Sequence, residues 1–123
     1  MASYANWYAG WLMILAAFVT GSVIGLFFWR NNFLGGYGSW PRRLTRLGHI
    51  ALAALGLFNV VYGMMPVGAV HGWRMELAGL GLIAGGIAMP TVCFLSAWNQ
   101  AFRRLFFIPV GMLVSAVVLI LLG

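Results

Sequence analysis

Acidic residues are almost missing from this 123-residue chain, which has no aspartate and one glutamate, Glu76. Lysine is missing as well, so all seven basic residues are arginine. No Ser-His-Asp triad can form without aspartate, and two histidines, one glutamate and one cysteine make no metal-ligand cluster. No glycine-rich phosphate-binding motif is present either. The single Cys93 excludes an intrachain disulfide and is expected to be a buried core residue. These absences argue against an enzyme.

Charge of either sign is missing from four long stretches: Met1–Trp29, Leu47–Trp73, Leu77–Phe102 and Leu105–Gly123. A helix needs about 20 mostly apolar residues to cross roughly 30 Å of hydrocarbon. A charge at mid-bilayer costs at least about 2.5 kcal/mol. The stretches therefore predict an all-α integral membrane four-helix bundle, with spans at about 6–29, 48–68, 75–98 and 105–122.

The overall composition leaves no room for a soluble domain beside these helices. The chain is 63% hydrophobic and 7% charged, with a mean hydropathy of +0.99, so residues 1–123 are expected to form one bundle. The N-terminal stretch has no positively charged start, and its apolar part is longer than that of a typical signal peptide. We therefore expect it to remain as the first span.

The arginines indicate an orientation. Six of them fall in the two loops after the first and third spans: Arg30, Arg42, Arg43, Arg46, Arg103 and Arg104. Only Arg74 falls in the loop between the second and third spans. The positive-inside rule then places both termini on the outer side, which is the periplasm for the bacterial inner membrane that we expect.

Aromatic residues agree with this orientation, because amphipathic rings prefer the headgroup level. An outer belt is predicted from Tyr4, Trp7, Tyr8, Trp11 and Trp73, and an inner belt from Trp29, Tyr37, Trp40 and Trp98.

The first loop is the only sizeable segment outside the predicted spans. Residues 31–39 are rich in turn-forming glycines, and Pro41 is typical of the first turn of a helix, here a short amphipathic one over Arg42–Leu47. Arg42, Arg43 and Arg46 could bind lipid phosphates or an acidic partner. The alternative is that they are ordinary topology charges.

Small residues predict where the helices meet, because they let backbones approach closely in lipid. The predicted packing residues are Gly21 and Gly25 in the first span, Gly56, Asn59 and Gly63 in the second, and Gly81 and Gly85 in the third. The fourth span has only the pair Gly111 and Ser115, so we expect it to be more exposed. Pro90 is expected to kink the third span.

His49 is the candidate cofactor ligand. It lies near the inner end of the second span among small residues, where an imidazole could ligate haem iron or a chlorophyll magnesium. The alternative is a histidine that hydrogen-bonds a facing helix or reaches the membrane interface. His71 cannot be a second ligand, because 22 residues of helix separate the two by about 33 Å. It is expected in a loop.

Two further polar residues have competing interpretations. Glu76 could couple protons, but at the outer end of the third span, near Arg74, a local ion pair or a helix-start charge is the simpler interpretation. Asn59, near the middle of the second span, is expected to hydrogen-bond another helix, with Tyr62, Ser22 or Thr20 as candidate partners, or else a bound cofactor.

Three functional hypotheses follow. The first is a non-catalytic accessory subunit of a larger membrane complex, with other membrane subunits and lipids as partners and neither nucleic acid nor a soluble substrate. By analogy, respiratory and photosynthetic electron-transfer complexes contain such subunits. The second is a haem- or chlorophyll-binding protein with His49 as axial ligand. The third is a small oligomeric transporter or channel that would depend on Asn59 or Glu76.

Overall fold

The uncharged stretches fold into four long helices in the computed structural model, which describes residues 2–27, 29–30, 35–66 and 72–122. Helix α1 spans Ala2–Phe27, α2 Trp40–Gly63, α3 Trp73–Trp98 and α4 Phe107–Leu122. A 3₁₀ helix, η2, spans Gln100–Phe106 and leads into α4. No strand occurs in these described ranges. The prediction of an all-α chain with four long apolar helices is thereby confirmed.

Local residue chemistry sets where α2 begins. Gly35 and Gly36 adopt positive φ angles of 88° and 102°, which glycine tolerates, and turn the chain ahead of the helix. The Ser39 hydroxyl then accepts a hydrogen bond from the Arg42 backbone N–H at 3.3 Å, and proline occupies the first turn. Helix α2 therefore starts at Trp40, ahead of the predicted span at 48, and the expected short helix over Arg42–Leu47 is its first part.

Helix α3 runs without interruption past Pro90 to Trp98, where the chain turns sharply. Asn99 has an extended backbone, and its side chain accepts a hydrogen bond from the Ala101 N–H at 3.0 Å. This cap starts η2, which carries Arg103 and Arg104. Because α4 itself begins only at Phe107, the fourth apolar span consists of η2 and α4 together.

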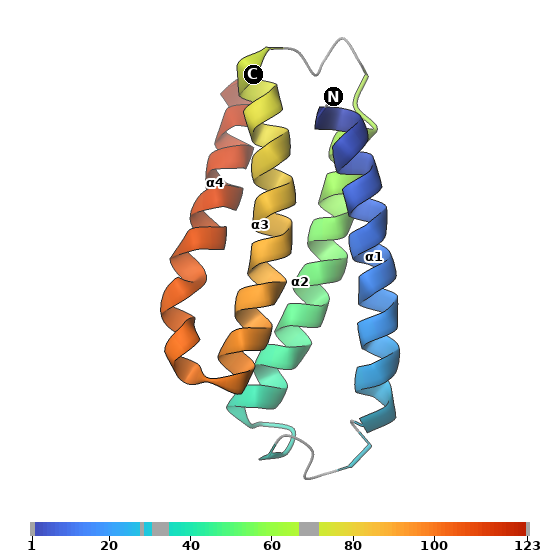
Figure 1. Ribbon diagram of the computed structural model, residues 1–123, viewed down its shortest axis with the longest axis vertical. Helices are drawn as coiled ribbons and strands as arrows, with labels where there is room; N and C mark the ends of the chain where they lie inside the picture. The colour runs from blue at the N-terminus through green and yellow to red at the C-terminus, as the bar shows by residue number, and fades with distance from the viewer. Residues whose placement is uncertain (1, 28, 31–34, 67–71, 123) are drawn as a thin grey trace.

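The helices run antiparallel to their chain neighbours, with α2 and α3 in the middle and α1 and α4 on opposite sides (Figure 1). Helix α1 packs on α2 and less extensively on α3, whereas α4 packs mainly on α3. Of the four, α3 is the most buried and α4 the least. The bundle is therefore open between α1 and α4, and the expectation of an exposed fourth span agrees with this arrangement.

Four segments are long and apolar enough to cross a membrane: Tyr4–Phe27, Trp40–Gly63, Trp73–Trp98 and Gln100–Leu122. These spans indicate a membrane protein. Both chain ends lie at one end of the bundle, and the α1–α2 connection and η2 lie at the other (Figure 1). We call the latter the arginine end, since six of the seven arginines precede α2, begin α2 or lie in η2.

Candidate functional site: a buried polar network between the helices

Two fully buried asparagines join three helices near the termini. The Asn6 amide of α1 donates from Nδ2 to Asn59 Oδ1 of α2 at 2.8 Å and to the Gly79 carbonyl of α3 at 2.9 Å. Asn59 Nδ2 in turn donates to the Leu82 carbonyl of α3 at 3.1 Å and to the Leu55 carbonyl at 2.9 Å. An unpaired amide in hydrocarbon is costly, so these bonds hold α1, α2 and α3 in one register.

The prediction that Asn59 bonds another helix is confirmed, but the predicted partners are wrong. Thr20 and Ser22 donate to carbonyls of their own helix, α1. Tyr62 instead donates its hydroxyl to the Met75 carbonyl at the start of α3. The partner that sequence reasoning missed is Asn6, a single polar residue at the start of an apolar run.

Glycines bring the backbones close enough for this network. A Cβ on Gly56 would lie 2.9 Å from the Gly10 carbonyl oxygen and 2.9 Å from Met13 Cβ, both on α1. A Cβ on Gly10 would meet the Gly56 carbonyl oxygen at 2.5 Å. On α3, a Cβ on Gly86 would lie 3.1 Å from Asn59 Nδ2. Gly56 is thus a packing residue as predicted, and Gly10 is its partner across the α1–α2 crossing.

The other predicted packing glycines behave differently from one another. Gly81 faces Ala116 and Gly85 faces Leu113, so this GxxxG pair seats α4 on α3. A Cβ on Gly25 would meet no atom within 4 Å in the described part of the chain, so Gly25 does not contribute to packing there. Gly63 is half-buried at the last position of α2. On α4, a Cβ on Gly111 would also meet no described atom within 4 Å, and Ser115 is exposed. The contact with α3 is made instead by Met112, Leu113 and Ala116.

His49 bonds α1 through its ring. Its Nε2 lies 2.9 Å from the Ala17 carbonyl oxygen, and a Cβ on Gly21 would lie 2.7 Å from the same nitrogen. A carbonyl can only accept, so Nε2 carries the proton and donates. This geometry is the facing-helix hydrogen bond that competed with axial ligation. Gly21, which was predicted as a packing residue, leaves room for this imidazole.

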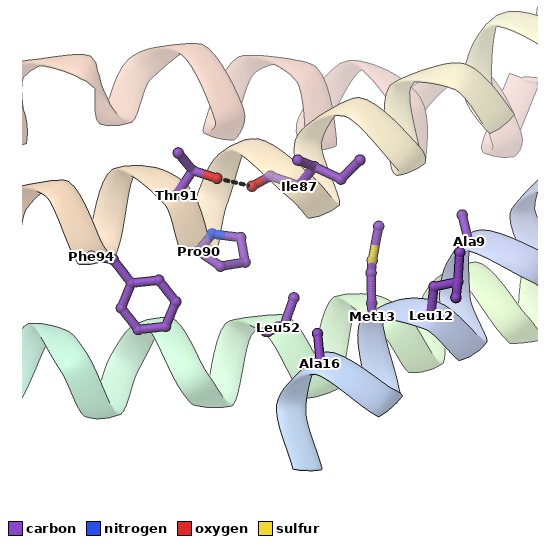
Figure 2. A pocket seen from close by; sticks show the side chains of 9 residues that line it. All are labelled: Ala9, Leu12, Met13, Ala16, Leu52, Ile87, Pro90, Thr91 and Phe94. Carbon is purple, nitrogen blue, oxygen red and sulfur yellow. Dashed lines mark hydrogen bonds between the residues drawn. The ribbon is translucent and has the colours of Figure 1, made fainter. Parts of the chain in front are cut away.

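An apolar cleft lies beside the network, between α1 and α3 over Leu52 of α2 (Figure 2). It measures about 340 Å³ and is lined by Ala9, Leu12, Met13, Ala16, Leu52, Ile87, Pro90, Thr91 and Phe94. Its one hydroxyl, Thr91 Oγ1, donates to the Ile87 carbonyl at 2.7 Å (Figure 2). The cleft therefore offers an apolar surface without a free polar group to orient a ligand.

The arginine end differs from the expected exposed charge cluster. Of the three arginines predicted to contact lipid or a partner, only Arg43 is exposed. Arg42 is 4% exposed and donates from Nη1 to the Arg30 carbonyl at 3.2 Å. Arg46 is half-buried, with its guanidinium 4.1 Å from the centroid of the Tyr37 ring. The long side chains of Arg42 and Arg46 thus pack against the α1–α2 connection.

The opposite end carries the only acid. Glu76 is exposed in the first turn of α3, where a negative charge is favourable to the helix dipole. The Arg74 guanidinium lies 5.6 Å from the centroid of the Trp73 ring. His71 lies outside the described residues, as do Asn31 to Leu34 of the first loop.

The predicted aromatic belts are exposed at both ends except for one residue. Tyr4, Trp7, Tyr8, Trp11 and Trp73 are exposed toward the termini, and Trp29, Tyr37 and Trp98 at the arginine end. Trp40 is half-buried and donates from Nε1 to the Ser96 carbonyl at 2.7 Å, which ties α2 to α3.

Comparison of the chain with known protein families, with curated proteins and with solved structures gave no match. The arrangement of its own side chains is therefore what bears on function. Those side chains join the helices by hydrogen bonds from Asn6, Trp40, His49, Asn59 and Tyr62.

Proposed function

We propose that this chain is a non-catalytic accessory subunit of a larger membrane protein complex. One observation carries the proposal: four polar side chains that lie between the helices form hydrogen bonds across helices. Asn6, Asn59, His49 and Tyr62 each bond a neighbouring helix. Groups bound in this way fix helix positions and are not poised to react with or transfer a substrate.

The finer parts of this proposal follow from the sequence. We place the chain in a bacterial inner membrane with both termini on the periplasmic side, because six arginines gather at the other end. We assign it to an energy-converting, electron-transfer complex by analogy with the small subunits of such assemblies. Its partners would be other membrane subunits, which contact the apolar outer faces of α1 and α4.

The two competing hypotheses receive less support from the geometry. Axial ligation by His49 would require its Nε2 to leave the Ala17 carbonyl, or the ligand bond to form at the other ring nitrogen. A transport path would require Asn59 to leave a network that occupies its amide, while Glu76 lies exposed at one end. Neither residue is poised for the role.

The test is extraction of the tagged chain from membranes of its own host in a mild detergent. The extract is separated on a native gel, and the co-migrating proteins are identified by mass spectrometry. We expect the chain to migrate with identified subunits of one complex, in fixed stoichiometry and in two different detergents. An untagged strain serves as control. Migration as a monomer or small homo-oligomer would overturn the proposal.

A visible absorption spectrum of the same purified sample tests the cofactor hypothesis separately. A coloured protein that loses its colour on His49→Ala would support axial ligation and contradict the present assignment of His49 to helix packing.

A further inference from the structure

The arginine end lacks a counter-charge within the chain. Six of the seven arginines lie there, whereas the only acid, Glu76, lies in the first turn of α3 at the other end. Glu76 precedes Trp98 by 22 residues (98 − 76), which corresponds to about 33 Å of helix. At that distance exposed charges are screened from one another. The anions that neutralise these arginines must come from outside the chain.

Two of these arginines are more buried than an orientation signal requires. The positive-inside rule needs only charge on one side, and exposed Arg43, Arg103 and Arg104 already supply it. Arg42, by contrast, is 4% exposed and tied to the Arg30 carbonyl. One terminal nitrogen of Arg46, Nη1, is buried and meets no hydrogen-bond acceptor in the described ranges. A buried cationic donor without an acceptor is costly, so it indicates a missing anion.

The geometry brings three guanidinium-bearing residues to one place. Arg42 and Arg46 are four residues apart on α2, and so occupy the same face one turn apart. Helical side chains lean toward the helix N-terminus, which carries Arg46 toward Arg42. The Arg42 Nη1 bond to the Arg30 backbone carbonyl joins this pair to the backbone after the end of α1, where the Arg30 guanidinium lies over the Trp29 ring. We call Arg30, Arg42 and Arg46 the guanidinium cluster.

Arginines that share one junction repel one another through their charge, and an anion bound among them would remove that repulsion. A phosphate matches the cluster chemically, because guanidinium groups bind phosphate oxygens in a planar, bidentate manner. The cluster also lies at the N-terminal, positive end of the 24-residue helix α2, where an anion is favoured.

The surrounding residues indicate a lipid as the source of that phosphate. Trp29, Tyr37 and Trp98 are exposed at this end, and such rings lie at the headgroup level of a bilayer. The Arg30 and Arg46 guanidinium groups each lie over one of these rings, at 5.5 Å from Trp29 and 4.1 Å from Tyr37. The cluster therefore lies where phospholipid phosphates are concentrated.

We propose that Arg30, Arg42 and Arg46 form a binding site for the phosphate of an anionic phospholipid headgroup, at the junction of α1 and α2. The site does not depend on the proposed accessory role, since it would bind lipid in the isolated protein as well as in a complex. Its occupant neutralises the guanidinium cluster and accepts the unused hydrogen bond of Arg46.

The experiment uses the full chain in nanodiscs of phosphatidylcholine with and without phosphatidylglycerol. Lipid retained by the protein is measured by native mass spectrometry, and the unfolding temperature is followed in parallel. The wild type should retain phosphatidylglycerol and unfold at a higher temperature when it is present. Arg46→Gln keeps most of the side chain but removes the charge, and should weaken phosphatidylglycerol binding about tenfold or more. Arg103→Gln, on exposed η2, is the matched control and should change binding less than about twofold.

Several outcomes would overturn the site. Equal retention of phosphatidylcholine and phosphatidylglycerol would contradict it. An equal loss of phosphatidylglycerol binding in Arg46→Gln and Arg103→Gln would also contradict it, because it would indicate binding by general surface charge. Inorganic phosphate can also be added to the protein in nanodiscs of phosphatidylcholine alone. If it stabilises the protein as strongly as phosphatidylglycerol does, the site binds a free anion instead of a lipid. An acidic protein bound at the cluster in place of lipid would contradict the lipid assignment. Arg46→Lys, which restores charge without the planar fork, should recover binding only in part and thereby separates a folding defect from lost recognition.

Discussion

Single polar residues decide the stability of this bundle because apolar contacts alone cannot. In a bilayer, lipid tails solvate an apolar helix face as well as another helix does, so helices associate through close packing and hydrogen bonds. Asn6 and Asn59 supply both, since they are fully buried and lie among glycines. At the residue scale, the loss of either amide should therefore lower the stability of the bundle.

The Asn6–Asn59 bond can be measured by a double-mutant cycle. Asn59→Leu keeps the branched shape of the side chain and removes bonds to α1 and α3, so we expect the free energy of unfolding to fall by about 1 kcal/mol. Asn6→Leu should cost a similar amount, and the double variant less than the sum, because both single changes remove the same bond. Unfolding by titration with a denaturing detergent provides the measurement. Ser22→Ala, which affects only an exposed bond within α1, is the control. Strict additivity would show that the two amides do not interact.

His49 gives a second test at this scale, because its two possible roles tolerate different substitutes. Gln presents an amide N–H close to the position of the imidazole Nε2, so His49→Gln should keep the bond to the Ala17 carbonyl and most of the stability. His49→Leu should lose about 1 kcal/mol in the same unfolding assay. If Gln and Leu are equally damaging, the imidazole has a role that the helix contact does not explain.

At the scale of the helices, the sequence predicts which segments are helical better than which faces meet. The four spans follow from charge-free stretches, because burying a charge in hydrocarbon is the largest cost that the chain must avoid. The charges of Arg42 and Arg46 suggested a short helix over Arg42–Leu47 ahead of a span beginning at 48, whereas α2 is one continuous helix from Trp40 and both side chains pack beside its first turns. A charge near the membrane surface shortens the apolar part of a helix, but the helix itself can continue past it.

The candidate site was only partly predictable for a related reason. A GxxxG pair can be recognised within one helix, but the rotation of that helix against its neighbours depends on every other contact. Gly81 and Gly85 face α4, whereas Gly25 faces no described residue. Likewise, the position of Asn59 in an apolar helix implied a partner, but only the register of α1 against α2 identifies Asn6.

This contrast between glycines supplies a matched pair of variants. Gly56→Leu would drive a side chain into the Gly10 carbonyl and Met13, so α1 and α2 must separate. We expect a loss of more than about 2 kcal/mol in the free energy of unfolding. Gly25→Leu adds the same side chain to α1, where a Cβ meets no atom of the described residues within 4 Å. It should change stability by less than about 0.5 kcal/mol. Tolerance of Gly56→Leu would mean that this helix face contacts lipid and that the α1–α2 crossing is wrong.

At the scale of the whole molecule, the charge distribution predicts the chain's orientation in a membrane. Arginines that lie before α2, in its first turns and in η2 would all remain on the cytoplasmic side, and Arg74 alone would cross. If all four candidate spans cross the membrane, the same six-to-one bias would fix the side of both ends of the molecule. The termini would accordingly face the periplasm.

Single cysteines introduced into a Cys93→Ala background test this orientation in intact cells. Tyr4 is exposed toward the termini, and Gln100 is exposed at the arginine end. Tyr4→Cys should therefore react with an impermeant thiol reagent in intact cells, whereas Gln100→Cys should react only after lysis.

Replacing the exposed Arg43, Arg103 and Arg104 by glutamine leaves three arginines of the six (6 − 3 = 3) against Arg74. Since none of the three is buried, the bundle should fold as before, but part of the population should invert, and Gln100→Cys should then be labelled in intact cells. If Gln100→Cys is labelled before lysis without these replacements, the orientation is reversed, and the guanidinium cluster lies in the outer leaflet.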